Sequence, residues 1–122
     1  MTYRVGSLFA GIGGFDLAAQ WVGWRTVWVS EIDPFASAVL AERFPGVPNH
    51  GDITRINFAN VEPVDVLCGG FPCQDISTAG KGAGIDGERS GLWREYARAI
   101  GELRPRCVVV ENVAALLGRG LE

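Results

Sequence analysis

The sequence contains few of the residues that cross-link small proteins or bind metals in them. Among its 122 residues there is a single histidine, His50, and there are only three cysteines, Cys68, Cys73 and Cys107. An odd number of cysteines, two of them within apolar runs, argues against a disulfide framework. Cys68 and Cys73 lack the short spacing of a zinc-binding pair, and no second pair follows. We therefore expect neither disulfides nor a metal site.

Long apolar segments are also lacking. No stretch of the chain approaches the roughly 18 uninterrupted apolar residues that a membrane span requires. No basic and apolar leader opens the chain either. We therefore expect a cytoplasmic protein that does not contact a membrane.

The chain has no excess of positive charge. Its net charge of −3 argues against a surface that binds a polyanion on every side. The charges are unevenly divided, because residues 1–75 carry four arginines and eight acids, whereas residues 76–122 carry seven Lys and Arg residues and six acids. A solvated surface of mixed charge is the simpler explanation of this distribution. Any contact with nucleic acid is expected from the second half.

Along the chain, segments with a helical pattern alternate with segments that have a strand pattern. Helical patterns begin near Asp16, Asp33 and Ser90, and Asp33 and Ser90 are expected to cap their helices. Strands are predicted for short apolar or β-branched runs at residues 5–9, 25–30, 50–54 (the weakest), 64–68 and 107–110. This alternation predicts one α/β domain, a Rossmann-like and mostly parallel sheet with helices on both faces.

The unusual residues of the chain lie where the predicted strands end, which is where ligands bind to parallel sheets. The turn FAGIGGF, residues 9–15, lets the backbone approach a ligand beside a helix N-terminus. Glu31, twenty residues after Gly11, could accept both hydroxyls of a ribose. Asp52 is suited to accept a hydrogen bond from the amino group of an adenine. Each residue alone is explained by turn or cap geometry, but together they predict a nucleoside pocket.

Cys73 follows a proline in the turn GGFPCQD, after the strand predicted at residues 64–68. The only histidine is in a different loop, so a Cys–His pair is poorly supported. Glu111, after the last predicted strand, is a better partner, because an acid can donate a proton to a ring nitrogen while a thiolate adds to the ring. Cys73 as a buried apolar residue and Glu111 as a strand-end hydrogen-bonding residue remain alternatives. Their joint placement favours the catalytic interpretation.

Several motifs occur in a characteristic order: FAGIGGF, an acid after the second strand, GDI, GGFPCQDIS, ERSGLW and ENV. Over residues 5–113 they resemble the DNA (cytosine-5) methyltransferase family, and GGFPCQ with a downstream ENV is the most specific pair. The resemblance implies a fold that binds S-adenosylmethionine. It also implies methyl transfer to carbon-5 of cytosine in double-stranded DNA, as in restriction–modification enzymes of bacteria and phages or in nucleoid-associated enzymes.

The resemblance further implies which residues would bind S-adenosylmethionine. Phe9 would pack near the sulfonium, Glu31 would hold the ribose hydroxyls, and Asp52 with Ile53 would fix the adenine. The implied lining consists of Phe9, Ala10, Gly11, Ile12, Gly13, Gly14, Glu31, Ile32, Asp52, Ile53, Pro72 and Leu92.

The resemblance implies roles for the catalytic residues as well. Cys73 would attack carbon-6 of a cytosine turned out of the duplex, and Glu111 would protonate or hydrogen-bond its nitrogen-3. Pro72 would stiffen the turn that directs the thiol, and Asn112 would support Glu111. A loop over residues 74–89 would close over DNA, with contacts from Gln74, which adjoins the thiol, and from Ser77, Lys81 and Arg89.

Members of this family continue beyond ENV with a further catalytic strand, a target-recognition region and a segment that completes the cofactor pocket. Residues 1–122 have no counterpart of these segments. We therefore expect a partial catalytic domain, truncated after about five strands and inactive without a complementing chain. The alternative is a non-catalytic module that binds S-adenosylmethionine, or one that self-associates as a homo-oligomer through the exposed edge of the strand at residues 107–110.

Overall fold

The computed structural model describes residues 2–70 and 87–111, apart from the side chains of residues 87–90 and 111. No helix in this part of the chain is long and apolar enough to cross a bilayer. In chain order the elements are β1 (Arg4–Leu8), α1 (Gly14–Trp21), β2 (Arg25–Ser30), α2 (Pro34–Arg43), the 3₁₀ helix η1 (Ile53–Arg55), β3 (Val66–Gly70), α3 (Gly87–Leu103) and β4 (Cys107–Glu111).

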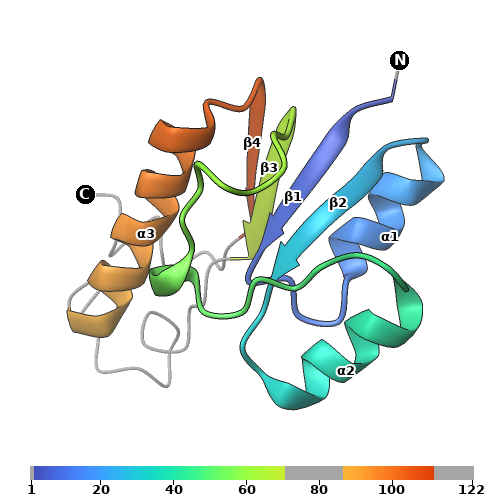
Figure 1. Cartoon of the computed structure of the whole chain (residues 1–122), viewed down its shortest axis with the longest axis horizontal. Helices are drawn as coiled ribbons and strands as arrows, with labels where there is room; N and C mark the ends of the chain where they lie inside the picture. Colours follow the sequence, from blue (N-terminus) through green and yellow to red (C-terminus); the bar gives the residue numbers. More distant parts are fainter. Residues whose placement is uncertain (1, 71–86, 112–122) are drawn as a thin grey trace.

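The described strands form one parallel sheet in the order β2-β1-β3-β4. Helices α1 and α2 cover one face of this sheet, and α3 covers the other (Figure 1). The predicted α/β class, with a Rossmann-like parallel sheet and helices on both faces, is confirmed. Because the strands run in one direction, their carboxyl ends meet at one edge, where ligands bind in such sheets.

The strand predicted at residues 50–54 does not form. Asn49 makes an isolated parallel bridge to Val29 of β2, and the chain then turns away. Asp52 instead becomes the N-cap of η1, where its side chain accepts a hydrogen bond from the backbone N–H of Thr54 at 2.9 Å. The described residues therefore hold four strands rather than about five, because a local capping contact replaces the ladder.

The ends of α2 and α3 can be compared with the cap and stop residues predicted from the sequence. The side chain of Asp33 caps α2 by accepting a backbone hydrogen bond at 2.8 Å, as predicted. Helix α3 begins at Gly87, three residues before the expected cap Ser90. It ends at Leu103, before Pro105, which lacks the N–H that a continuing helix would need.

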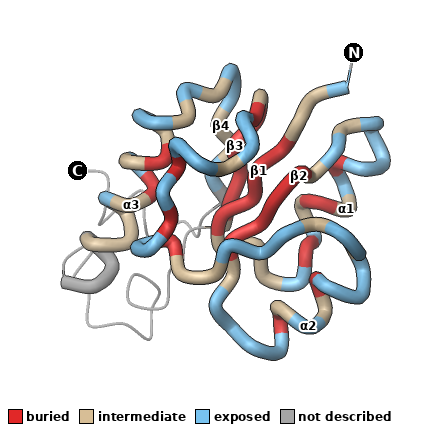
Figure 2. The backbone as a smooth tube through the Cα atoms, viewed as in Figure 1, coloured by how far each residue is buried: buried red, intermediate tan, exposed pale blue. Residues whose placement is uncertain are grey.

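Apolar clusters pack on both faces of the sheet, and buried residues follow the strands (Figure 2). The cluster under α3 centres on Trp28, Leu67 and Tyr96, all fully buried. The indole of Trp28 lies across β1 at Gly6, where an added Cβ would come within 2.8 Å of three ring atoms. Only glycine therefore lets this ring pack against the sheet. The cluster under α1 consists of the buried residues Val5, Ala19, Val66 and Cys68.

Candidate functional site

A cavity of about 330 Å³ opens at the carboxyl ends of β1, β2 and β3. Six residues that the sequence predicts for a cofactor pocket line it: Phe9, Glu31, Ile32, Asp52, Ile53 and Leu92. The lining also includes Ser30, Gly51 and Gly70, which the sequence analysis did not name. Their positions in the sequence could have indicated them, because Ser30 and Gly70 end strands and Gly51 belongs to the GDI motif.

Of the predicted residues, Ala10–Gly13 form the turn between β1 and α1, and Gly14 is the first residue of α1. The backbone is left-handed at Phe9 (φ 50°), Gly11 (φ 59°) and Gly13 (φ 88°). At Gly11 nothing lies within 4 Å of an added Cβ, so the conformation alone requires glycine there. At Gly13 an added Cβ would also lie 2.6 Å from the ring of Phe44, so this glycine lets α2 approach. The left-handed Phe9 is unusual for a bulky residue and is typical of a functional turn.

Glu31 joins the glycine turn to the start of α2. One carboxylate oxygen accepts a hydrogen bond from the N–H of Gly11 at 2.7 Å, and the other accepts one from the N–H of Asp33 at 3.0 Å. Each carboxylate oxygen has two lone pairs, so each can still accept a second hydrogen bond. Two backbone contacts therefore orient the Glu31 carboxylate in the cavity wall and leave it able to accept a pair of hydroxyls.

Asp52 is held by its own cap. One oxygen accepts hydrogen bonds from the N–H of Thr54 at 2.9 Å and from its hydroxyl at 2.8 Å. The bonds to the hydroxyl and to the backbone N–H, in that order, lower the pKa of Asp52 below its usual value, so the side chain is a carboxylate near neutral pH. A lining acid of this kind is a hydrogen-bond acceptor.

Apolar side chains complete the cavity wall. The ring of Phe9 packs 6.1 Å from that of Tyr96, centre to centre, and Ile53 is buried in the same cluster under α3. Ile32 is 71% exposed at the cavity and packs little against the rest of the chain. An exposed isoleucine beside two acids can cover one face of a flat apolar ring.

The ends of β3 and β4 lie side by side. Gly70, which lines the cavity, is the register partner of Glu111. Cys73 is three residues after Gly70 in the sequence. The backbone that carries Glu111 and the strand that leads to Cys73 therefore meet at the edge of the sheet where the cavity lies.

The other predicted site residues are not placed by the structure. Arg89 and Glu111 are described only as backbone, in α3 and β4. Pro72, Cys73, Gln74, Ser77, Lys81 and Asn112 lie outside the described residues.

The thiol of Cys68 belongs to the core. Cys68 is fully buried on β3, and burial, with a smaller contribution from the nearby Asp16, raises its pKa to about 12. Such a thiol is a small apolar residue rather than a nucleophile. In the part of the chain that the structure describes, no three His, Cys, Asp or Glu residues are grouped as metal ligands.

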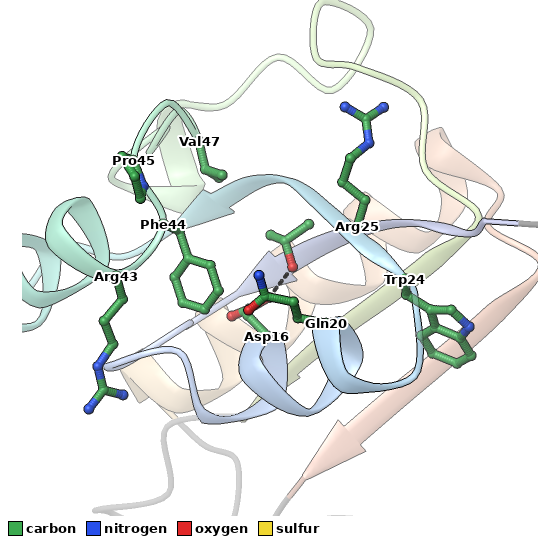
Figure 3. A pocket seen from close by; sticks show the side chains of 9 residues that line it. Asp16, Gln20, Trp24, Arg25, Arg43, Phe44, Pro45 and Val47 are labelled. Carbon is green, nitrogen blue, oxygen red and sulfur yellow. Dashed lines mark hydrogen bonds between the residues drawn. The ribbon is translucent and has the colours of Figure 1, made fainter.

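A second cavity, of about 220 Å³, lies between α1, β2 and the end of α2 (Figure 3). Asp16 is at its base, only 1% exposed, and accepts hydrogen bonds from the hydroxyls of Ser7 at 3.1 Å and Thr26 at 2.8 Å. Burial raises the pKa of Asp16. The hydrogen bonds to Ser7 of β1 and Thr26 of β2 make Asp16 a structural link from α1 to both strands. The two cavities share no lining residue.

A known protein family matches almost the whole chain. The C-5 cytosine-specific DNA methylase family matches residues 3–121. The chain belongs to this family. The resemblance seen in the sequence motifs is thereby confirmed, and methyltransferases of this family use S-adenosylmethionine.

Two relatives of the chain are type II methyltransferases from bacteria. The chain is 42% identical over 118 residues to the type II methyltransferase M2.BsuMI of Bacillus subtilis (strain 168), and the match covers 93% of this chain and 30% of the relative. It is 45% identical over 115 residues to M1.ScrFI of Lactococcus lactis subsp. cremoris, covering 93% and 29%.

A solved structure supports the same fold. It is a candidate DNA modification methyltransferase encoded within a prophage (E. coli), and it matches with a TM-score of 0.77 and 31% identity over 94% of this chain and 33% of that chain. The chain thus spans about 30% of the length of the curated relatives reported above.

Proposed function

We propose that this chain carries the S-adenosylmethionine pocket and the nucleophilic cysteine of a DNA cytosine-5 methyltransferase. The observation that supports the proposal most strongly is the first cavity. Glu31 and Asp52 both line this cavity at the carboxyl ends of the strands. Acids at these positions are expected to bind ribose and adenine. Family membership indicates the reaction, and the cavity indicates where the cofactor would bind.

The residues around the cavity are suited to the parts of such a cofactor. Glu31 would accept hydrogen bonds from the ribose hydroxyls, since both of its oxygens are oriented by backbone contacts and keep a free lone pair. Asp52 would accept a hydrogen bond from the adenine amino group. Phe9, Ile32 and Leu92 would pack against its apolar parts. S-adenosylmethionine, when bound, supplies the methyl group.

Cys73 and Glu111 would act on the cytosine. The Cys73 thiolate would form a bond to carbon-6 of a cytosine turned out of the duplex, while Glu111 would protonate or hydrogen-bond nitrogen-3. Carbon-5 would then be electron-rich enough to take the methyl group. Loss of the carbon-5 proton and cleavage of the bond between the Cys73 sulfur and carbon-6 would give 5-methylcytosine and release the thiolate. The adjacent ends of β3 and β4, with Gly70 opposite Glu111, support this pairing.

The remaining predicted residues would have supporting roles. Pro72 would stiffen the turn that carries the thiol, and Asn112 would orient Glu111. The DNA contacts would come from Gln74, Ser77, Lys81 and Arg89.

Methyl transfer would also require a complementing chain or further segments of the same protein. Among the described residues, β4 pairs only with β3 and so forms one edge of the sheet, where Val110 is 39% exposed. An exposed strand edge can pair with another chain. The second candidate function is a module that binds the cofactor without turnover, or one that self-associates through this same edge.

A methyl-transfer assay tests the proposal. The chain is incubated with labelled S-adenosylmethionine and duplex DNA, alone and with a polypeptide that carries the later segments of a relative, and the methylated base is identified. We expect cofactor binding but no transfer by the chain alone. We expect 5-methylcytosine in the complemented mixture, and none with Cys73→Ser. Product formed equally by Cys73→Ser, or methylation of a base other than cytosine, would contradict the proposal.

A further inference from the structure

Asn49 links the backbone beside both acids of the first cavity. Its Oδ1 accepts hydrogen bonds from the N–H of Glu31 at 3.0 Å and from the N–H of Gly51 at 2.9 Å. Gly51 directly precedes Asp52. One side chain therefore bridges the segment that carries Glu31 and the segment that carries Asp52.

The amide nitrogen of Asn49 completes this bridge. Its Nδ2 donates to the carbonyl of Glu31 at 3.2 Å and to the hydroxyl of Ser37 at 3.1 Å. Two acceptor and two donor positions exhaust the hydrogen-bonding capacity of a carboxamide. Because both backbone N–H groups point at one atom and a carbonyl points at the other, only an amide satisfies the whole arrangement.

The chain on either side of Asn49 is anchored to β2. The N–H of Val29 donates to the carbonyl of Pro48 at 2.9 Å, and the N–H of His50 donates to the carbonyl of Val29 at 2.8 Å. The hydroxyl of Ser30 donates to the carbonyl of Gly51 at 2.6 Å. Asn49 extends this attachment past the end of β2 to Glu31, where the strand ladder has stopped.

We propose that Asn49 is a positioning residue that sets the separation of the Glu31 and Asp52 carboxylates, and so determines how strongly the cavity selects a ribose joined to an adenine. The inference rests on the proposed function. Asn49 does not line the cavity itself, so it acts through the two acids. Without it, the Glu31 backbone would lose an N–H partner and a carbonyl partner together.

Discrimination between a ribose and a 2′-deoxyribose separates positioning from general stability. Affinities for S-adenosylhomocysteine and for its 2′-deoxy analogue are measured by calorimetry, for the unaltered chain and for Asn49→Ala. The unaltered chain is expected to prefer the ribose form by about tenfold, the effect of a hydrogen bond to a charged acceptor. In Asn49→Ala this preference should fall to roughly threefold or less, because Glu31 is no longer held in place. A variant that is merely less stable would lose affinity for both ligands equally.

Two further variants strengthen the experiment. Asn49→Asp keeps an oxygen that can accept from both N–H groups, but it replaces the donor to the Glu31 carbonyl by a second acceptor oxygen. Its preference for ribose should fall to an intermediate value. Asn57→Ala is the matched control, because Asn57 also accepts a local backbone hydrogen bond, from Ala59 at 3.0 Å, but does not contact the cavity. It should retain the full preference.

The outcomes distinguish the two proposals. If the unaltered chain binds ribose ligands and both Asn49 variants keep its preference, the positioning role is overturned while the proposed function stands. An equal loss of affinity for both ligands would also overturn that role. If the unaltered chain binds neither ligand, the proposed cofactor pocket is wrong, and the inference fails with it.

Discussion

The carboxylate of Glu31 lies 2.7 Å from the backbone nitrogen of Gly11, although twenty residues separate them in the chain. This hydrogen bond holds the glycine turn after β1 against the end of β2. The other oxygen of Glu31 holds the start of α2 through the N–H of Asp33. A single acid thus joins three segments around the cavity, and its negative charge lies near the N-terminus of α2, where the helix dipole favours an anion.

Replacement of Glu31 by alanine tests the cofactor assignment directly. Glu31→Ala should abolish binding of S-adenosylmethionine that calorimetry can detect, because a paired, charged acceptor for two hydroxyls is lost. The matched control is Glu42→Ala, which removes an exposed acid from α2 away from the cavity. The control should bind as the unaltered chain does. Unchanged binding by Glu31→Ala would show that the ribose assignment is wrong.

The cysteines of the described residues should differ sharply in reactivity. Cys68 is buried with a pKa of about 12, whereas Cys107 is exposed at the start of β4. Alkylation with iodoacetamide at about pH 8 should therefore modify Cys107 and leave Cys68 intact until the chain unfolds. Mass spectrometry of peptides from native and urea-unfolded samples measures both. Rapid labelling of Cys68 in the native chain would mean that β3 is more accessible than the structure indicates.

The close approach of Trp28 to Gly6 predicts a large cost for a single methyl group. Gly6→Ala should lower the free energy of unfolding by about 1–3 kcal/mol, because the added Cβ would overlap the indole ring. Gly101→Ala is the control, since an added Cβ there meets nothing within 4 Å and the residue lies in α3. That variant should gain roughly 0.5–1 kcal/mol from helix propensity. Urea unfolding measures both, and equal effects would contradict the packing.

Asp16 should make the stability of the fold depend on pH. Burial raises the pKa of Asp16 above its usual value, so the folded chain binds a proton at Asp16 more tightly than the unfolded chain does. This contribution to stability is fully present below the unfolded pKa and is lost as pH rises through the raised folded value. Asp16→Asn, which keeps the shape of the side chain, should remove the dependence.

The measurement is urea unfolding of both proteins between about pH 3 and pH 7. Relative to Asp16→Asn, the unaltered chain should lose stability as pH rises across this range. A relative gain over the same range would mean that the hydrogen bonds from Ser7 and Thr26 outweigh the desolvation of the carboxylate.

Much of the cavity could be predicted because its signals are local. The glycine turn needs left-handed residues, and Gly11 and Gly13 supply them. The cap at Asp33 depends on contacts within one turn of the helix. The strand predicted at residues 50–54 was wrong because Asp52 bonds Thr54, a contact over two residues that competes with strand pairing. A D-x-T pattern carries that signal, and it could have been recognised.

The sequence by itself determined the alternation of strands and helices and the strand-end positions of Glu31 and Asp52, since the spacing of apolar residues, glycine turns and strand-end acids are properties of short segments. The apolar lining residues Phe9, Ile32, Ile53 and Leu92 were expected only from the resemblance of the motifs to a known family. Only the tertiary structure decided that Asp16 is a buried link between two strands and that Asn49 joins the segments of Glu31 and Gly51. Hydrogen bonds between distant segments depend on how strands align and where loops end, and no pattern within one segment records that alignment.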